Sequence, residues 1–112
     1  IPYTDTALTI RVKNVDFSAE NIRGVYVTLR QGQHSITFEP DDVSVDGEYV
    51  TVNLTQRQTS KFIPTTLLNA PKCEGIVNWV ERISSKDYRR GSTTVNITVG
   101  KQLMQEVVNV DS

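Results

Sequence analysis

Branching at the β-carbon is the sequence feature that most constrains the fold of this chain. Val, Thr and Ile number 15, 13 and 8, so 36 of the 112 residues are β-branched, against only 3 Ala and 6 Leu. A second heavy atom on Cβ restricts side-chain rotamers in a helix and suits the pleated surface of a sheet. The sequence therefore predicts an all-β protein.

Alternation of apolar and polar residues marks the expected strands, because a period of two with one apolar side is typical of a half-buried strand. The apolar positions of these strands are Leu8, Ile10 and Val12; Val25, Val27 and Leu29; His34, Ile36 and Phe38; Val43 and Val45; Val50, Val52 and Leu54; Val95, Ile97 and Val99. We also expect an edge strand at Leu67-Leu68 and a last strand, Leu103–Val110, that closes the sheet.

Turn-forming residues separate these segments. Asn14–Gly24 has the composition of a loop, and Gln31-Gly32-Gln33 that of a tight turn. Asp46-Gly47 between two apolar runs predicts a two-residue hairpin in which both residues have positive φ. Ser84–Gly91 is expected to be a polar turn.

One short helix is expected between strands. Thr55 followed three residues later by Gln58 matches a capping box, in which each side chain bonds the other residue's backbone N–H. We therefore predict one or two helical turns near residues 55–61, with Phe62 anchoring the end of the segment in the core.

The segment Gly75–Ile83 is apolar on both sides, which is typical of a central strand or of a strand with a second contact surface. One side carries Ile76 and Val80, and the other carries Val77, Trp79 and Ile83. We expect four residues in particular to lie in the core, namely Val27, Val52, Phe62 and Trp79.

Seven to nine short strands with turn signals about every ten residues are typical of a β-sandwich or small barrel. We predict a single-domain, antiparallel, immunoglobulin-like β-sandwich that spans residues 1–112.

The charged and reactive residues argue against several functions. The net charge is −1, whereas nucleic-acid binding draws most of its affinity from excess basic charge. No apolar run approaches the ~20 residues that span a bilayer. The single His34 and single Cys73 provide neither a zinc site nor a recognisable nucleophile–base pair, and acidic residues 39–48 suit a solvated turn better than a calcium loop. We expect no enzyme activity, cofactor, metal, nucleic acid or membrane partner.

Tyr88-Arg89-Arg90 is the sequence's most suggestive surface feature. An aromatic ring beside two guanidinium groups is typical of protein–protein hot spots, although charged turns are also common without any binding role. We treat these three residues as the candidate partner surface.

Three segments carry a family resemblance. They are Val25–Gly32, then Asp46-Gly47 followed by Val52–Thr59, and then Val99–Leu103. With them the chain resembles the small all-β proteins encoded in prophages and phage-like elements of Firmicutes and related gut bacteria. Where members of that family commonly have Glu, this chain has Arg57 and Gln58.

The resemblance implies a structural role in a phage particle. We expect a non-enzymatic structural or assembly module that contacts itself or another phage structural protein, first in the cytoplasm of the bacterial host and then in the virion. The alternative is a small carbohydrate-binding module in which Trp79 and Tyr26, together with Tyr88, provide stacking faces.

Overall fold

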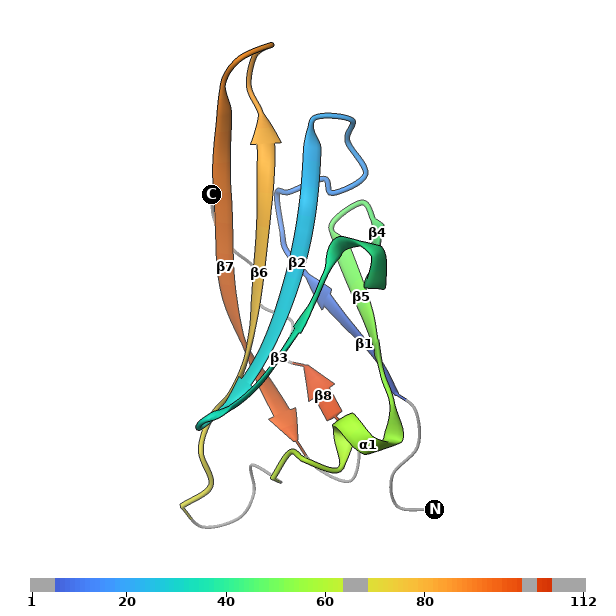
Figure 1. The fold of residues 1–112 in the computed structure, drawn as a ribbon, viewed down its shortest axis with the longest axis vertical. Helices are drawn as coiled ribbons and strands as arrows, with labels where there is room; N and C mark the ends of the chain where they lie inside the picture. Colours follow the sequence, from blue (N-terminus) through green and yellow to red (C-terminus); the bar gives the residue numbers. More distant parts are fainter. Residues whose placement is uncertain (1–5, 64–68, 100–102, 106–112) are drawn as a thin grey trace.

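The computed structural model describes residues 6–63, 69–99 and 103–105, and it confirms an all-β sandwich. Two antiparallel sheets face each other, one with the order β1-β5-β4 and the other with the order β3-β2-β6-β7-β8 (Figure 1). The strands are β1 (Thr6–Arg11), β2 (Ile22–Gln31), β3 (His34–Phe38), β4 (Val43–Asp46), β5 (Tyr49–Leu54), β6 (Cys73–Arg82), β7 (Tyr88–Val99) and β8 (Leu103–Gln105). A 3-10 turn, η1 (Pro40–Asp42), and a helix, α1 (Gln56–Thr59), join strands.

The predicted alternation places the core between the sheets. The apolar positions of β1, β2, β5 and β7 are all buried, and their neighbours in sequence are more exposed. Val27, Val52, Phe62 and Trp79 all lie in the core, as expected. Burying one side of each strand removes apolar surface from water, which is the main favourable contribution to folding.

The β2–β3 and β4–β5 hairpins each have a glycine, Gly32 and Gly47, directly after the last paired residue of the first strand. Asp46 pairs with Tyr49, so the β4–β5 loop consists of Gly47 and Glu48, and only Gly47 has positive φ, at 58°. Glycine at the first loop position is typical of a type II′ turn. The prediction that Asp46 and Gly47 form the loop, both with positive φ, is therefore wrong by one residue.

Three strands differ in extent from the prediction. β2 begins at Ile22 inside the expected loop, because Gly24, with φ 58°, permits an irregular register between Arg23 and Tyr26. β6 runs from Cys73 to Arg82, so Ile83 falls outside it and is 58% exposed. β7 begins at Tyr88, because the long pairing with β6 extends into the segment predicted to be a turn.

The predicted capping box is present, but the helix is shorter than expected. Thr55 Oγ1 accepts from the backbone N–H of Gln58 at 3.2 Å, and Gln58 Oε1 accepts from that of Thr55 at 2.8 Å. Lys61 and Phe62 then donate to carbonyls three residues back, which tightens the chain and ends α1 at Thr59. This turn carries Phe62 into the core.

Two expected strand segments lie wholly or partly outside the described residues. They are the Leu67-Leu68 edge strand and the part of Leu103–Val110 that follows β8.

Trp79 packs closely against Gly91, and this contact links β6, the central strand of the larger sheet, to its neighbour β7. The residues are paired across β6 and β7, and a Cβ built on Gly91 would overlap the indole ring. The edge of Phe17, from the β1–β2 loop, completes the contact, with ring centroids 5.3 Å apart and an interplanar angle of 89°. The indole is thus enclosed, with 9% of Trp79 exposed.

We expect Gly91→Ala to destabilise the fold by about 1–3 kcal/mol, because an added methyl overpacks a filled site. Trp79→Ala should cost about 3–5 kcal/mol, as for other large core truncations. In a denaturant titration of the double variant, the two costs should be non-additive, since removing the indole makes room for the methyl. Gly75→Ala is the control, because its added Cβ meets methyl ends of Ile97 and Ile10 and should not couple to Trp79. Additive costs for Gly91 and Trp79 would contradict this account.

We expect Thr55→Ala to lower the free energy of unfolding by about 1 kcal/mol, because the Gln58 N–H loses its cap. Thr55→Asp and Thr55→Ser retain an acceptor and should be close to the wild type in thermal or denaturant unfolding. Equal damage from Asp and Ala would show that the cap does not stabilise this segment.

Candidate interaction site

The β6–β7 hairpin projects from one end of an elongated molecule of 48 × 24 × 22 Å (Figure 1). Its tip is closed by the backbone N–H groups of Ile83 and Ser84, which both donate to the Asp87 carbonyl at 2.9 and 3.2 Å. The Ser84 hydroxyl also bonds the Asp87 carboxylate at 3.0 Å. These bonds hold the backbone of the tip in a defined turn.

The strand geometry divides the candidate residues Tyr88, Arg89 and Arg90 between two faces, because successive side chains of a strand point to opposite sides. Arg89 pairs with Glu81 at 3.0 Å on the face that is continuous with the inner side of the sheet. Tyr88 and Arg90 lie on the outer face, where they are paired across the hairpin with Arg82 and Val80. The three residues therefore do not form one surface.

A different surface emerges on the outer face of the hairpin, which we call the arm patch. It consists of Arg23, Arg82, Tyr88 and Arg90, all exposed, and 61% of Tyr88 is accessible. Arg23 belongs to the arm patch because β2 places it opposite Val80, and Val80 is paired on its other side with Arg90. Within the described part of the chain, none of the three arginines forms a salt bridge. Sequence patterns do not indicate Arg23, because it is 59 to 67 residues away from the others.

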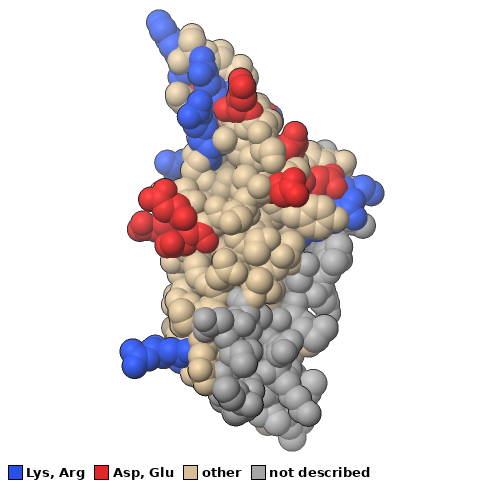
Figure 2. All heavy atoms as spheres, turned by 90° about the vertical axis from the view of Figure 1, so that its right-hand side faces the viewer, with Lys and Arg blue, Asp and Glu red and all other residues tan. Residues whose placement is uncertain are grey.

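Basic side chains are concentrated at the hairpin end of the molecule, and a separate group of acidic side chains lies further down the same view (Figure 2). The turn that leads from β3 into η1 contributes Glu39, Asp41 and Asp42, all exposed. None of these three carboxylates forms a salt bridge with another described residue. We call Glu39, Asp41 and Asp42 the acidic turn.

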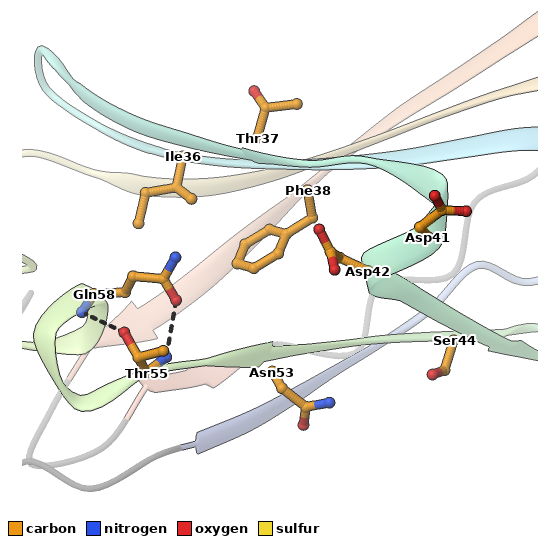
Figure 3. A pocket seen from close by; sticks show the side chains of 9 residues that line it. All are labelled: Ile36, Thr37, Phe38, Asp41, Asp42, Ser44, Asn53, Thr55 and Gln58. Atoms are coloured by element: carbon orange, nitrogen blue, oxygen red, sulfur yellow. Dashed lines mark hydrogen bonds between the residues drawn. The ribbon is translucent and has the colours of Figure 1, made fainter.

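The acidic turn borders a hollow of about 430 Å³ on the side of the sandwich where β3 and β5 diverge. Figure 3 shows Ile36 and Phe38 pointing from β3 into this space, with Asp42 close to Phe38. Thr55 and Gln58 of the capping box close the opposite end. The hollow thus places two apolar residues, Ile36 and Phe38, beside two carboxylates in a lining that is otherwise polar, which suits a cationic group that also carries some apolar surface.

Trp79 and Tyr26 do not form the stacking surface that the carbohydrate-binding alternative requires. Tyr26 lies on the outer face of the larger sheet and is 42% exposed, opposite Asn78. Trp79 points to the inner face, where Phe17 and Gly91 cover it. A second hollow, of about 830 Å³, borders Trp79 between the β1–β2 loop and the hairpin, but Tyr26, on the opposite face of the sheet, does not line it. We base no proposal on this pair.

His34 and Cys73 lie on opposite sides of Gln31, since Gln31 pairs with His34 in β3 and with Cys73 in β6. Two strand spacings separate them, or about 10 Å, too far for proton transfer between the side chains. The buried Gln31 instead fixes the connection into β6: its amide group donates to the carbonyls of Ile63 and Pro71 and accepts from the Ile63 N–H. Its neighbours Gly32 and Gln33 indicate a turn, but nothing in the sequence predicts this role of Gln31.

Burial raises the pKa of the Cys73 thiol to about 11, and the negative charge of neighbouring Glu74 adds to the shift. His34 instead packs against Phe62, with ring centroids 5.1 Å apart. Within the described ranges, no three His, Cys, Asp or Glu side chains are grouped closely enough to hold a metal ion. Among the same residues, no helix is long and apolar enough to cross a membrane.

No protein-family model, curated protein or solved structure matches this chain. The phage resemblance therefore stays a prediction.

We expect Cys73 to react with a thiol reagent at pH 8 only when the protein unfolds, because the thiolate is scarce and the sulfur is enclosed. The measurement is the rate of colour release from Ellman's reagent in buffer and in guanidinium chloride, which serves as the fully reactive control. A native rate equal to the unfolded rate would contradict the burial of this thiol.

Proposed function

We propose that this chain is a non-enzymatic assembly module that binds a partner protein through the arm patch. The observation that carries the proposal is the outer face of the projecting hairpin, where exposed Tyr88 lies among three arginines that lack a salt bridge within the described residues. Tyr and Arg are enriched at the centres of protein interfaces, where a ring supplies apolar contact area and a guanidinium supplies several donors.

The position of the arm patch supports the proposal in a second way. A hairpin that projects beyond the sandwich can enter a recess or lie along an edge of another protein without distorting its own core (Figure 1). The positive charge of the patch accelerates encounter with an acidic partner and fixes the orientation of the complex. Arg89, on the other face, forms a salt bridge with Glu81.

The partner we propose is a phage structural protein or another copy of this chain, in the host cytoplasm during assembly and then in the virion. This part of the proposal comes from the family resemblance. An immunoglobulin-like topology is also proposed. It is supported by the strand order, because labelling β1 to β7 as B, C, C′, D, E, F and G gives the sheets B-E-D and C′-C-F-G.

The test is incorporation into particles. Phage particles are produced from the source element with the wild-type chain or with Tyr88→Ser/Arg90→Ser, and the chain is quantified by mass spectrometry against the major capsid protein. We expect the wild type to be present and the arm variant to be reduced at least about tenfold, because a hot-spot pair carries much of the binding energy.

Tyr49→Ser/Lys72→Ser is the matched control, since it removes an exposed Tyr of the smaller sheet and an exposed cation away from the hairpin. It should be incorporated like the wild type. A wild-type chain that is absent from particles and also monomeric at high concentration would contradict the proposed function. Equal incorporation of the arm and control variants would show that another surface makes the contact.

A further inference from the structure

Two surfaces of opposite charge lie at separate places on this molecule. The arm patch carries Arg23, Arg82 and Arg90, and the acidic turn carries Glu39, Asp41 and Asp42. Neither set forms a salt bridge with another described residue. Exposed charges gain little from isolated pairs, but an array of complementary charges determines which surfaces associate and in what orientation.

The two surfaces cannot neutralise each other within one chain. The hairpin forms one end of the long axis, whereas η1 lies beside the sandwich, at the open side between β3 and β4 (Figure 1). No arginine of the arm patch lies within salt-bridge distance of a carboxylate of the acidic turn. Contact between them requires a second molecule.

The apolar parts of the two surfaces are also complementary. Tyr88 protrudes from the arm beside its cross-strand neighbour Arg82. The hollow next to the acidic turn has half-buried Ile36 and buried Phe38 as its floor (Figure 3). Asp41 and Asp42 line the same hollow, so a guanidinium group that enters it beside a tyrosine ring meets carboxylates.

We infer that the partner of the arm patch is a second copy of this chain, with Tyr88 of one copy seated in the Ile36–Phe38 hollow of the next. The inference rests on the proposed function and identifies its partner. Each copy then binds one neighbour through its arm and another through its hollow, so the contact is head-to-tail. Repetition of a head-to-tail contact builds a ring if the rotation closes and a filament if it does not.

The experiment uses charge reversal on each side of the contact. Sedimentation velocity is measured from micromolar to near-millimolar concentration for the wild type, for Arg82→Glu/Arg90→Glu and for Asp41→Arg/Asp42→Arg. We expect the wild type to self-associate at low salt and to dissociate at about 1 M NaCl, where the Debye length is about 3 Å. Each reversed variant alone should remain monomeric, because its arm and hollow then carry the same charge.

An equimolar mixture of the two reversed variants should assemble again, since every arm then meets a hollow of opposite charge. Lys13→Glu/Lys72→Glu, with the same change in net charge, should behave like the wild type. If a reversed variant fails to fold, Arg82→Gln/Arg90→Gln replaces it, and it should weaken association about tenfold or more.

Each other outcome overturns the inference. Self-association of both reversed variants would place the contact elsewhere, and a mixture that stays monomeric would exclude the hollow as the receptor. A wild type that is monomeric at all concentrations, but enters particles in an arm-dependent way, would show that the arm binds a different protein. That last result leaves the proposed function standing, so the two failures are distinguishable.

Discussion

The contact between the Trp79 indole and Gly91 sets where the sandwich ends and where the arm begins. On the core side of this pair, β6 and β7 are covered by the smaller sheet and by Phe17 of the β1–β2 loop. Beyond it, the same two strands continue as the projecting hairpin, and their side chains are exposed. Because Gly91 has no side chain, the ring can lie across β7 and close the end of the core. The exposed arm is therefore an extension of a well-packed base.

The β1–β2 loop that carries Phe17 to Trp79 is itself held by the β4–β5 turn. Phe17 N–H donates to the Gly47 carbonyl at 2.7 Å, and the Gly47 N–H donates to Ser18 Oγ at 2.8 Å. Glu48 accepts from the Asn14 N–H and from Arg11, and these two contacts, in that order of importance, lower the pKa of its carboxyl. A turn of the smaller sheet thus positions a ring on the larger one, which couples the two layers at the base of the arm.

Charges that form salt bridges and charges that form none lie in different parts of the molecule. Arg11–Glu48, Arg30–Glu74 and Arg89–Glu81 each join neighbouring strands or a strand and its turn. The arm patch and the acidic turn have no such partners among the described residues. Apart from the Arg82 Nε donation to the Ser84 carbonyl, their charged groups are directed to solvent, and an array of either sign favours association with a surface of the other sign. The proposals for the arm and for the second copy follow from this contrast.

Local patterns in the sequence were sufficient for the capping box and for the buried side of β1, β2, β5 and β7, but not for β4, where Val45 is 38% exposed. Burial with period two and the Thr55–Gln58 cap depend on residues that are neighbours in sequence, so they can be predicted without knowing what lies across the sheet. The turn at Gly47 was misplaced by one residue because pairing with the opposite strand decides where a loop begins.

Only the tertiary structure decided the features that depend on distant residues. The need for glycine at position 91 arises from an indole twelve residues earlier, and the role of Gln31 arises from carbonyls at Ile63 and Pro71. Tyr88-Arg89-Arg90 resembles one cluster in sequence, but the pleat sends Arg89 to Glu81 and leaves Tyr88 and Arg90 on the other face with Arg23. The register between paired strands decides which residues are in contact and which share a face. Register is a property of the folded sheet rather than of any one segment.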